Sequence, residues 1–342
     1  VMKKIEKKNL SVLFEALAAK AALYIPADNA AGQSQFTRYE AGMTLSEKLN
    51  TARSPKDLFF PQIENLADFQ VSGKEIRVQE RKAPEEDFIL FGVRGCDCKS
   101  FEILDKVFLS EPADGYYAAR RSHGVVMTLA CGAPEETCFC GVFGIDPAAP
   151  GGDVSCYFAE DALFLQPLTP KGEALLEGIA LEEADSEPVE AEKASIRKIA
   201  ARLPLNQLST EAFGGDKTKT LFDRPEWETL AKSCIGCGTC TFVCPTCQCY
   251  DVKEFKAGDT VQRFRCWDSC MYKDFTLMSA GQPRPTQKER FRQRFMHKLV
   301  YYPANNEGLF SCVGCGRCVA KCPIHMNIAK VMKTLGGAQD EK

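Results

Sequence analysis

The feature that most restricts how this chain can fold is a pattern of cysteines that occurs twice in its last third. Each copy has four cysteines with the spacing C-x2-C-x2-C-x3-C, followed directly by proline. The members are Cys234, Cys237, Cys240 and Cys244 in the first copy, and Cys312, Cys315, Cys318 and Cys322 in the second. Thiols bunched in this way are typical of metal ligands, so the pattern predicts metal centres around which the backbone wraps.

This spacing is that of bacterial ferredoxins, in which the fourth cysteine of a copy ligates the other [4Fe-4S] cluster. Three thiolates two residues apart surround one face of a cubic cluster, and the chain then changes direction at the proline. We therefore predict two clusters, with cluster 1 ligated by Cys234, Cys237, Cys240 and Cys322, and cluster 2 by Cys312, Cys315, Cys318 and Cys244. Glycines at 236, 238, 314 and 316 permit the backbone angles of such tight loops.

Two other uses of cysteine fit this pattern less well. Tetrahedral zinc sites use paired C-x2-C knuckles, usually from separate turns, rather than four cysteines that end in C-x3-C-P. Disulfide scaffolds are typically short secreted chains, whereas this chain has 342 residues and 18 cysteines in tight groups. Iron–sulfur clusters are therefore the prediction, and a zinc-bound interaction module is the alternative.

Two more cysteines directly follow the first copy, in the run CPTCQC. Cys247 and Cys249 are not needed by clusters 1 and 2, and RCWDSC downstream offers Cys266 and Cys270. These residues predict a candidate third cluster held by Cys247, Cys249 and Cys270, with Cys266 as a further candidate ligand.

The N-terminal half holds a separate group of cysteines. Cys96 and Cys131 each follow a predicted buried strand, and parallel neighbouring strands would bring both to the same sheet edge. We predict a candidate fourth cluster there, held by Cys96, Cys131, Cys138 and Cys140. Cys156 and Cys98 are expected to be packing residues, because free cysteine is often buried.

The hydrophobic pattern predicts an α/β domain over residues 1–170. The runs 87–95 and 123–131 are apolar as buried strands are, a helical pattern lies between them, and 155–167 is typical of a hairpin. Residues 171–225 are a charged linker with a helix over about 194–203. Residues 226–342 show little strand pattern, which predicts an all-α, ferredoxin-like domain with two clusters. Its helix over 288–302 would bury Phe291, Phe295 and Leu299 and expose its arginines and lysine on a solvated face.

Composition excludes several functions. With 43 basic and 46 acidic residues the net charge is −3, which would not steer the chain to nucleic acid or to an acidic membrane. We find no signal peptide and no apolar run long enough to span a bilayer, and we expect a cytoplasmic protein. There is no G-x-G-x-x-G or Walker loop, so flavin and nicotinamide are expected on another subunit. The histidines, at 123, 297 and 325, are scattered, and no catalytic residue is predicted.

The order of these motifs resembles the beta subunit of cytoplasmic sulfhydrogenases and the iron–sulfur electron-transfer subunit of anaerobic sulfite reductase. The shared stretches run from FGVRGCD through ILDKVFL, CFC, CIGCGTCTFVCPTCQCYD, RCWDSC and KERFRQRF to CVGCGRCVAKCP. The resemblance implies an electron-transfer role with several four-iron clusters on the chain. Its ligand pattern includes Cys96, Cys131, Cys138, Cys140, Cys247, Cys249 and Cys270, while Cys98, Cys156 and Cys266 depart from it, so the third site lacks a fourth thiolate.

The family further implies two partner subunits: a flavoprotein that oxidises NAD(P)H, and a catalytic subunit of hydrogenase, sulfite reductase or disulfide reductase type. The expected function is a relay between them. The alternative is a catalytic subunit that binds substrate at an N-terminal cluster. The terminal couple, the direction of electron flow and the stoichiometry of the complex are left open by the sequence.

Overall fold

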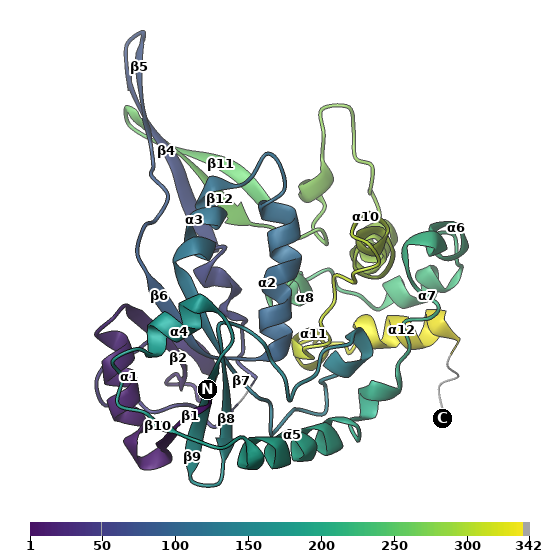
Figure 1. The fold of residues 1–342 in the computed structure, drawn as a ribbon. Helices are drawn as coiled ribbons and strands as arrows, with labels where there is room; N and C mark the ends of the chain where they lie inside the picture. The colour runs from purple at the N-terminus through teal and green to yellow at the C-terminus, as the bar shows by residue number, and fades with distance from the viewer. Residues whose placement is uncertain (49, 338–342) are drawn as a thin grey trace.

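The computed structural model describes residues 1–48 and 50–337 and contains two β-sheets with helices around them (Figure 1). The larger sheet is mixed and has eight strands in the order β10-β1-β9-β8-β7-β6-β2-β3. In chain order these are β1 (Lys3–Glu6), β2 (Ala22–Asp28), β3 (Ser34–Arg38), β6 (Phe88–Val93), β7 (Gly124–Leu129), β8 (Val154–Ala159), β9 (Ala162–Pro167) and β10 (Glu182–Glu183). The pairs β2–β6, β6–β7 and β7–β8 are parallel, and the others are antiparallel.

Helices cover both faces of this sheet, which is why the central strand β6 is buried along its whole length. On one face, α1 (Leu10–Ala18) and α4 (Pro170–Leu176) pack against β2, β6 and β7. On the other face, α2 (Gly95–Phe108) and α3 (Gly115–His123) pack with Phe59 and Phe60 against β6. Helix α5 (Glu187–Ala200) covers β8 and β9. The strands expected over 87–95 and 123–131 and the hairpin over 155–167 are confirmed.

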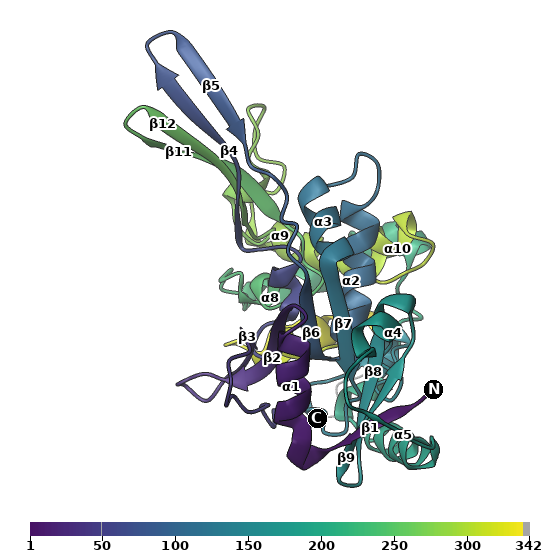
Figure 2. The ribbon, with the colours of Figure 1, turned by 60° about the vertical axis from the view of Figure 1, so that its left-hand side comes forward.

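The smaller sheet is antiparallel and joins segments from distant parts of the chain. Its order is β11-β12-β4-β5, with β4 (Ile63–Ser72) and β5 (Glu75–Glu80) from the N-terminal region and β11 (Tyr250–Ala257) and β12 (Thr260–Trp267) from the C-terminal region. Figure 2 shows both hairpins projecting from the body of the molecule. At its base Arg265 is buried and pairs with Glu64 (Nε to Oε2, 2.7 Å) and with Asp114 at the start of α3.

This sheet overturns the fold class expected for the C-terminal part, which is not all-α. Residues 250–267 form a β-hairpin that pairs with β4 over seven positions from Thr260 to Cys266. The strand pattern was missed because every residue of β11 is exposed, so hydrophobic and polar residues do not alternate along it. The domain boundaries at residues 170 and 225 stay a prediction.

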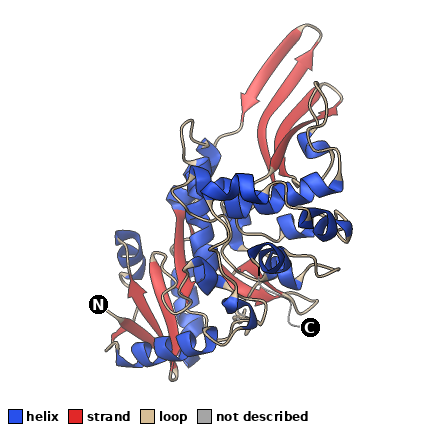
Figure 3. Ribbon diagram, turned by 90° about the vertical axis from the view of Figure 1, so that its right-hand side faces the viewer, coloured by secondary structure: helices blue, strands red, loops and turns tan. Residues whose placement is uncertain are grey.

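The rest of the C-terminal region is made of short helices (Figure 3). They are α6 (Thr218–Leu221), α7 (Glu226–Lys232), α8 (Thr239–Phe242), α9 (Gln287–Met296), α10 (Tyr302–Asn305), α11 (Arg317–Ala320) and α12 (Ile328–Gly336), with a π-helical turn over His297–Tyr301. Short 3-10 turns occur at Lys7–Asn9, Pro55–Leu58, Cys140–Phe143, Pro204–Gln207, Gly215–Lys217 and Asp274–Thr276. Phe291, Phe295 and Leu299 are buried in a core with Trp227 of α7 and Leu335 of α12, as expected.

Candidate iron–sulfur centres

The two copies of the cysteine pattern adopt the same local backbone. Gly236 and Gly238 have φ angles of 67° and 74°, and the equivalent Gly314 and Gly316 have 58° and 76°. The second glycine of each pair begins a four-residue helix, α8 in the first copy and α11 in the second, and these helices contact each other. Repeated left-handed glycines turn successive backbone N–H groups into a concave loop that favours anionic sulfur.

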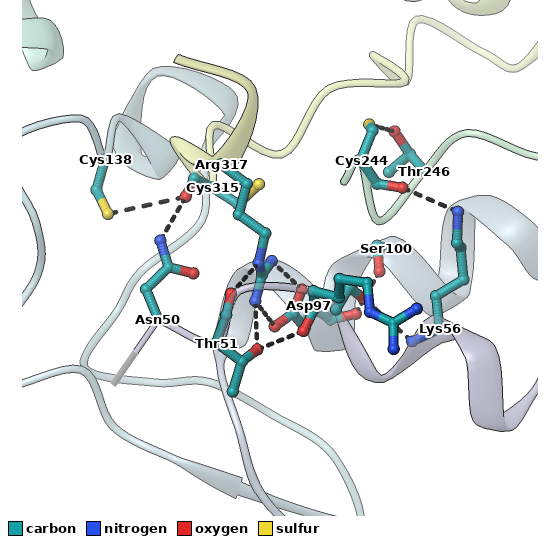
Figure 4. Close-up of polar contacts among 12 residues, drawn as sticks. Asn50, Thr51, Lys56, Asp97, Ser100, Cys138, Cys244, Thr246, Cys315 and Arg317 are labelled. Carbon is teal, nitrogen blue, oxygen red and sulfur yellow. Dashed lines mark hydrogen bonds and ion pairs between the residues drawn. The ribbon is translucent and has the colours of Figure 1, made fainter. Parts of the chain in front are cut away.

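The second loop packs tightly against the N-terminal region. A Cβ atom at Gly314 would lie 2.3 Å from the Phe139 carbonyl oxygen, and one at Gly316 would lie 2.6 Å from that of Thr137. Phe139 N donates to Gly314 O at 2.8 Å. Only glycine permits this approach, and it places Cys138 beside the second loop, with its Sγ 3.9 Å from Cys315 O (Figure 4).

The N-terminal cysteines line one cavity. Cys96 begins α2 after β6, and Cys131 follows β7, the parallel neighbour of β6, so both emerge at the same sheet edge. The cavity is lined by Cys96, Cys131, Cys138, Cys140 and Cys315, with Arg94 beside them. Burial raises the pKa of Cys138 and of Cys140 to about 12, so these thiols need a metal or a nearby positive charge to ionise.

The cysteines of the CPTCQC run fall into two contacts. Cys247 hydrogen bonds with Cys244, and Cys249 hydrogen bonds with Cys270. The bond to Cys270 lowers the pKa of Cys249 to about 7 in spite of its burial. Cys249 and Cys270 also line a cavity with His297, Arg284 and Gln293.

The remaining cysteines lie in regular structure. Cys266 lies in β12 opposite Asp251 and Ile63. Cys156 is fully buried in β8, and Cys98 lies on α2 against the core that contains Phe101. His123 pairs with Asp87 at 2.6 Å, and His325 approaches Cys322 through a backbone hydrogen bond of 3.2 Å.

Three buried basic residues surround the Cys244–Cys249 segment. Lys56, Arg294 and Lys298 are 2%, 2% and 3% exposed, and no carboxylate among the described residues forms an ion pair with them. Lys56 Nζ donates to Cys244 O at 3.0 Å and to Cys247 O at 2.8 Å (Figure 4), and lies 3.7 Å from the centre of the Trp267 ring. Lys298 Nζ donates to Thr246 Oγ1 at 2.7 Å and to Ser311 O at 2.9 Å.

Arg294 reaches the thiols themselves. Its Nε lies 2.9 Å from Cys240 Sγ and its Nη1 lies 3.9 Å from Cys247 Sγ. A hydrogen bond from Cys247, together with the charges of Lys298 and Arg294, lowers the pKa of Cys244 well below its usual value despite burial. Buried cations require compensating negative charge. Ionised thiolates around an anionic cluster supply it, so the donor set fits an iron–sulfur group.

Sequence reasoning missed these cations and placed the basic residues of 288–302 on a solvated face. For Arg294 and Lys298 that expectation is wrong. Each directly precedes a core residue, Phe295 and Leu299, and so shares the four-residue spacing of the buried face. That shared spacing was the available signal. Lys56 lies about 180 residues before the cysteines it contacts, and nothing in the sequence connects them.

A single-ion site is not seen in the part of the chain that the structure describes, since no group of three or more His, Cys, Asp or Glu side chains could hold one metal ion. A zinc knuckle would bring its sulfurs to within about 2.3 Å of one metal. The four thiolates of a four-iron cluster instead bind four different irons. None of the described helices has the length and apolar character needed to cross a membrane.

Comparison with known proteins adds two findings. Residues 233–326 match the family described as a 4Fe-4S dicluster domain, so this region binds [4Fe-4S] clusters. The chain is 34% identical over 264 residues to sulfhydrogenase 2 subunit beta of Pyrococcus furiosus, an alignment that covers 75% of this chain and 77% of that protein. No solved structure gives a significant match.

Proposed function

The chain belongs to the family of sulfhydrogenase beta subunits and is an iron–sulfur subunit, and from this premise we propose that it relays electrons between two partner subunits. One partner is a flavoprotein that oxidises NAD(P)H, and the other is a catalytic oxidoreductase subunit. Bound [4Fe-4S] groups supply one-electron chemistry, while the protein sets their potentials through burial, charge and hydrogen bonds to sulfur. We place this complex in the cytoplasm.

The observation that carries the proposal is the continuity of the cysteine groups. Cys315, a ligand proposed for cluster 2, lines the N-terminal cavity together with Cys96 and Cys140. Cys244, also assigned to cluster 2, contacts Cys247 of the third site. Neighbouring groups therefore adjoin each other from the N-terminal cavity to the one beside Cys249, as a chain of one-electron carriers requires.

We assign the ligands as the sequence suggested. Clusters 1 and 2 exchange their fourth cysteines, Cys322 and Cys244. The N-terminal cluster uses the cysteines at 96, 131, 138 and 140, and the third uses those at 247, 249 and 270. The N-terminal group has four thiols around its cavity, so it has no need of an open position for substrate, which favours the relay over the catalytic alternative.

Iron and acid-labile sulfide, counted per chain on protein purified without oxygen, test this proposal. We expect about twelve to sixteen of each, the content of three or four clusters. About eight of each would restrict clusters to the two ferredoxin loops and remove the relay through the N-terminal region. Zinc without sulfide would overturn the proposal.

A matched pair of variants assigns the N-terminal cluster. Cys131→Ser removes a proposed ligand, and we expect a loss of about four irons per chain. Cys156→Ser changes a fully buried cysteine in the core of β8, and should leave the iron content unchanged even where it lowers stability. Equal iron content in the two variants would contradict the N-terminal assignment.

A further inference from the structure

The three buried cations described above converge on one short segment from separate elements. Lys56 comes from the turn Pro55–Leu58, Arg294 from α9, and Lys298 from the π-helical turn that follows it. Each contacts a residue between Cys240 and Cys247: Lys56 at the carbonyls of Cys244 and Cys247, Arg294 at the Sγ of Cys240 and of Cys247, and Lys298 at Thr246. The Cys244–Cys247 pair thus lies inside a cage of positive charge.

The other cysteine groups have less uncompensated charge around them. Beside Cys96 and Cys315, the guanidinium of Arg317 is neutralised by Asp97, with Nη1 to Oδ1 at 2.6 Å and Nη2 to Oδ2 at 2.7 Å. In the first loop, Cys237 is exposed, and the contact to Cys234 comes from the neutral amide of Gln287 at 3.5 Å. The excess of positive charge is therefore greatest at the Cys244–Cys247 pair.

Fixed positive charge favours whichever redox state carries more negative charge, and the effect is strong where water is excluded. Resting on the function proposed above, we propose that Lys56, Arg294 and Lys298 make cluster 2, which Cys244 ligates, the cluster of highest potential in the chain. An electron in transit would then reside there, between the N-terminal cysteines and the third site.

The transfer itself balances simply. A one-electron donor, a reduced flavin in the complex or dithionite in a titration, is oxidised by one electron, and the same electron adds one negative charge inside the cage. No bond forms or breaks and no proton moves. Burial alone would lower the pKa of Lys298, but the thiolates of Cys244 and Cys247 raise it above its usual value, so this lysine keeps its charge.

The test is a potentiometric titration, followed by electron paramagnetic resonance, of anaerobically purified Lys298→Gln protein. We expect one cluster to become harder to reduce, with about a tenfold lower ratio of reduced to oxidised form at fixed potential, equivalent to about 59 mV for one electron. Lys298→Arg keeps the charge and should restore the original potential. Lys288→Gln is the matched control, because Lys288 lies on α9 but is exposed and pairs with Glu228.

Lys56→Gln provides a second variant if Lys298→Gln does not fold. A glutamine amide can still donate to the carbonyls of Cys244 and Cys247, so this change removes charge and keeps a donor. Iron and sulfide are counted first in every sample: their absence would overturn the proposed function. Full cluster content with unchanged potentials, or equal shifts in Lys288→Gln, would overturn the inference about the cations alone.

Discussion

At Gly314 the second cysteine loop passes so close to the N-terminal region that no side chain fits. We predict that Gly314→Ala destabilises the protein strongly and loosens cluster 2, because the added Cβ atom would lie 2.3 Å from Phe139 O. Gly258 in the β11–β12 turn has nearly the same φ angle, 60° against 58°, but its Cβ atom would meet nothing within 4 Å. Gly258→Ala should therefore cost only the backbone strain, about 1–2 kcal/mol.

Denaturant unfolding and iron content of the two variants separate the steric effect from the strain. The expectation is a much larger loss of stability, together with a loss of iron, in Gly314→Ala. Equal losses in both variants would show that the loop can move away from Phe139, and would contradict the tight contact between the two regions.

Arg317 and Asp97 form an ion pair in which both side chains are almost fully buried, and Arg317 Nε also donates to Thr51 O at 2.8 Å. We predict that Asp97→Asn lowers the free energy of unfolding by about 3–5 kcal/mol, because it leaves a buried guanidinium without its counter-ion. The exposed pair of Arg197 and Asp146 is the control, and Asp146→Asn should cost about 0–1 kcal/mol. Urea unfolding of both variants tests this, and similar costs would show that water reaches Arg317.

The cysteines of the two loops were predictable from the sequence because their spacing is itself the structural signal, and the family match to residues 233–326 agrees with it. Pairings between distant residues were not predictable. Thr51, Asp97 and Arg317 are separated by up to 266 residues, and no local pattern marks a side chain whose partner is set by tertiary packing. The buried cations around Cys244 were missed for the same reason.

At the scale of elements, α9 positions Arg294 and begins with a capping box formed by Thr286 and Glu289. We predict that Thr286→Ala costs about 1 kcal/mol, since the Thr286 side chain accepts from Glu289 N and the box satisfies two backbone donors. Ser186, which precedes α5, makes no side-chain capping bond, so Ser186→Ala is the control and should have little effect. A comparable loss in both variants, measured by thermal unfolding, would contradict the capping role.

The strands of the two sheets differ in how well the sequence indicates them. β6 and β7 are buried on both faces, so their apolar runs are continuous and easily recognised. β11 and β5 are exposed along their whole length, and they are held by backbone pairing to β12 and β4 instead of by a buried face. A sequence pattern reports burial, so strands without it remained hidden.

At the scale of the whole molecule, the N-terminal and C-terminal regions are joined by several independent contacts. β12 pairs with β4, the Gly314 loop lies against Phe139, and Tyr302 Oη donates to Ile103 O at 2.8 Å. The last of these connects α10 to the centre of α2. These contacts flank the cysteine groups, so the cluster environments are shared between the regions.

This arrangement predicts that the two regions do not function as separate pieces. Residues 226–342 expressed alone would keep all eight cysteines of the ferredoxin loops, yet would lack β4 beside β12, Lys56 beside Cys244, and Asp97 beside Arg317. We expect this fragment to hold fewer than eight irons per chain or to aggregate, since an unpaired β12 edge and a buried arginine without its partner are both unfavourable. Co-expression with residues 1–225 should restore iron content and give one complex in size-exclusion chromatography. A fragment that alone binds two clusters with the potentials of the intact chain would show that the N-terminal region contributes nothing to them.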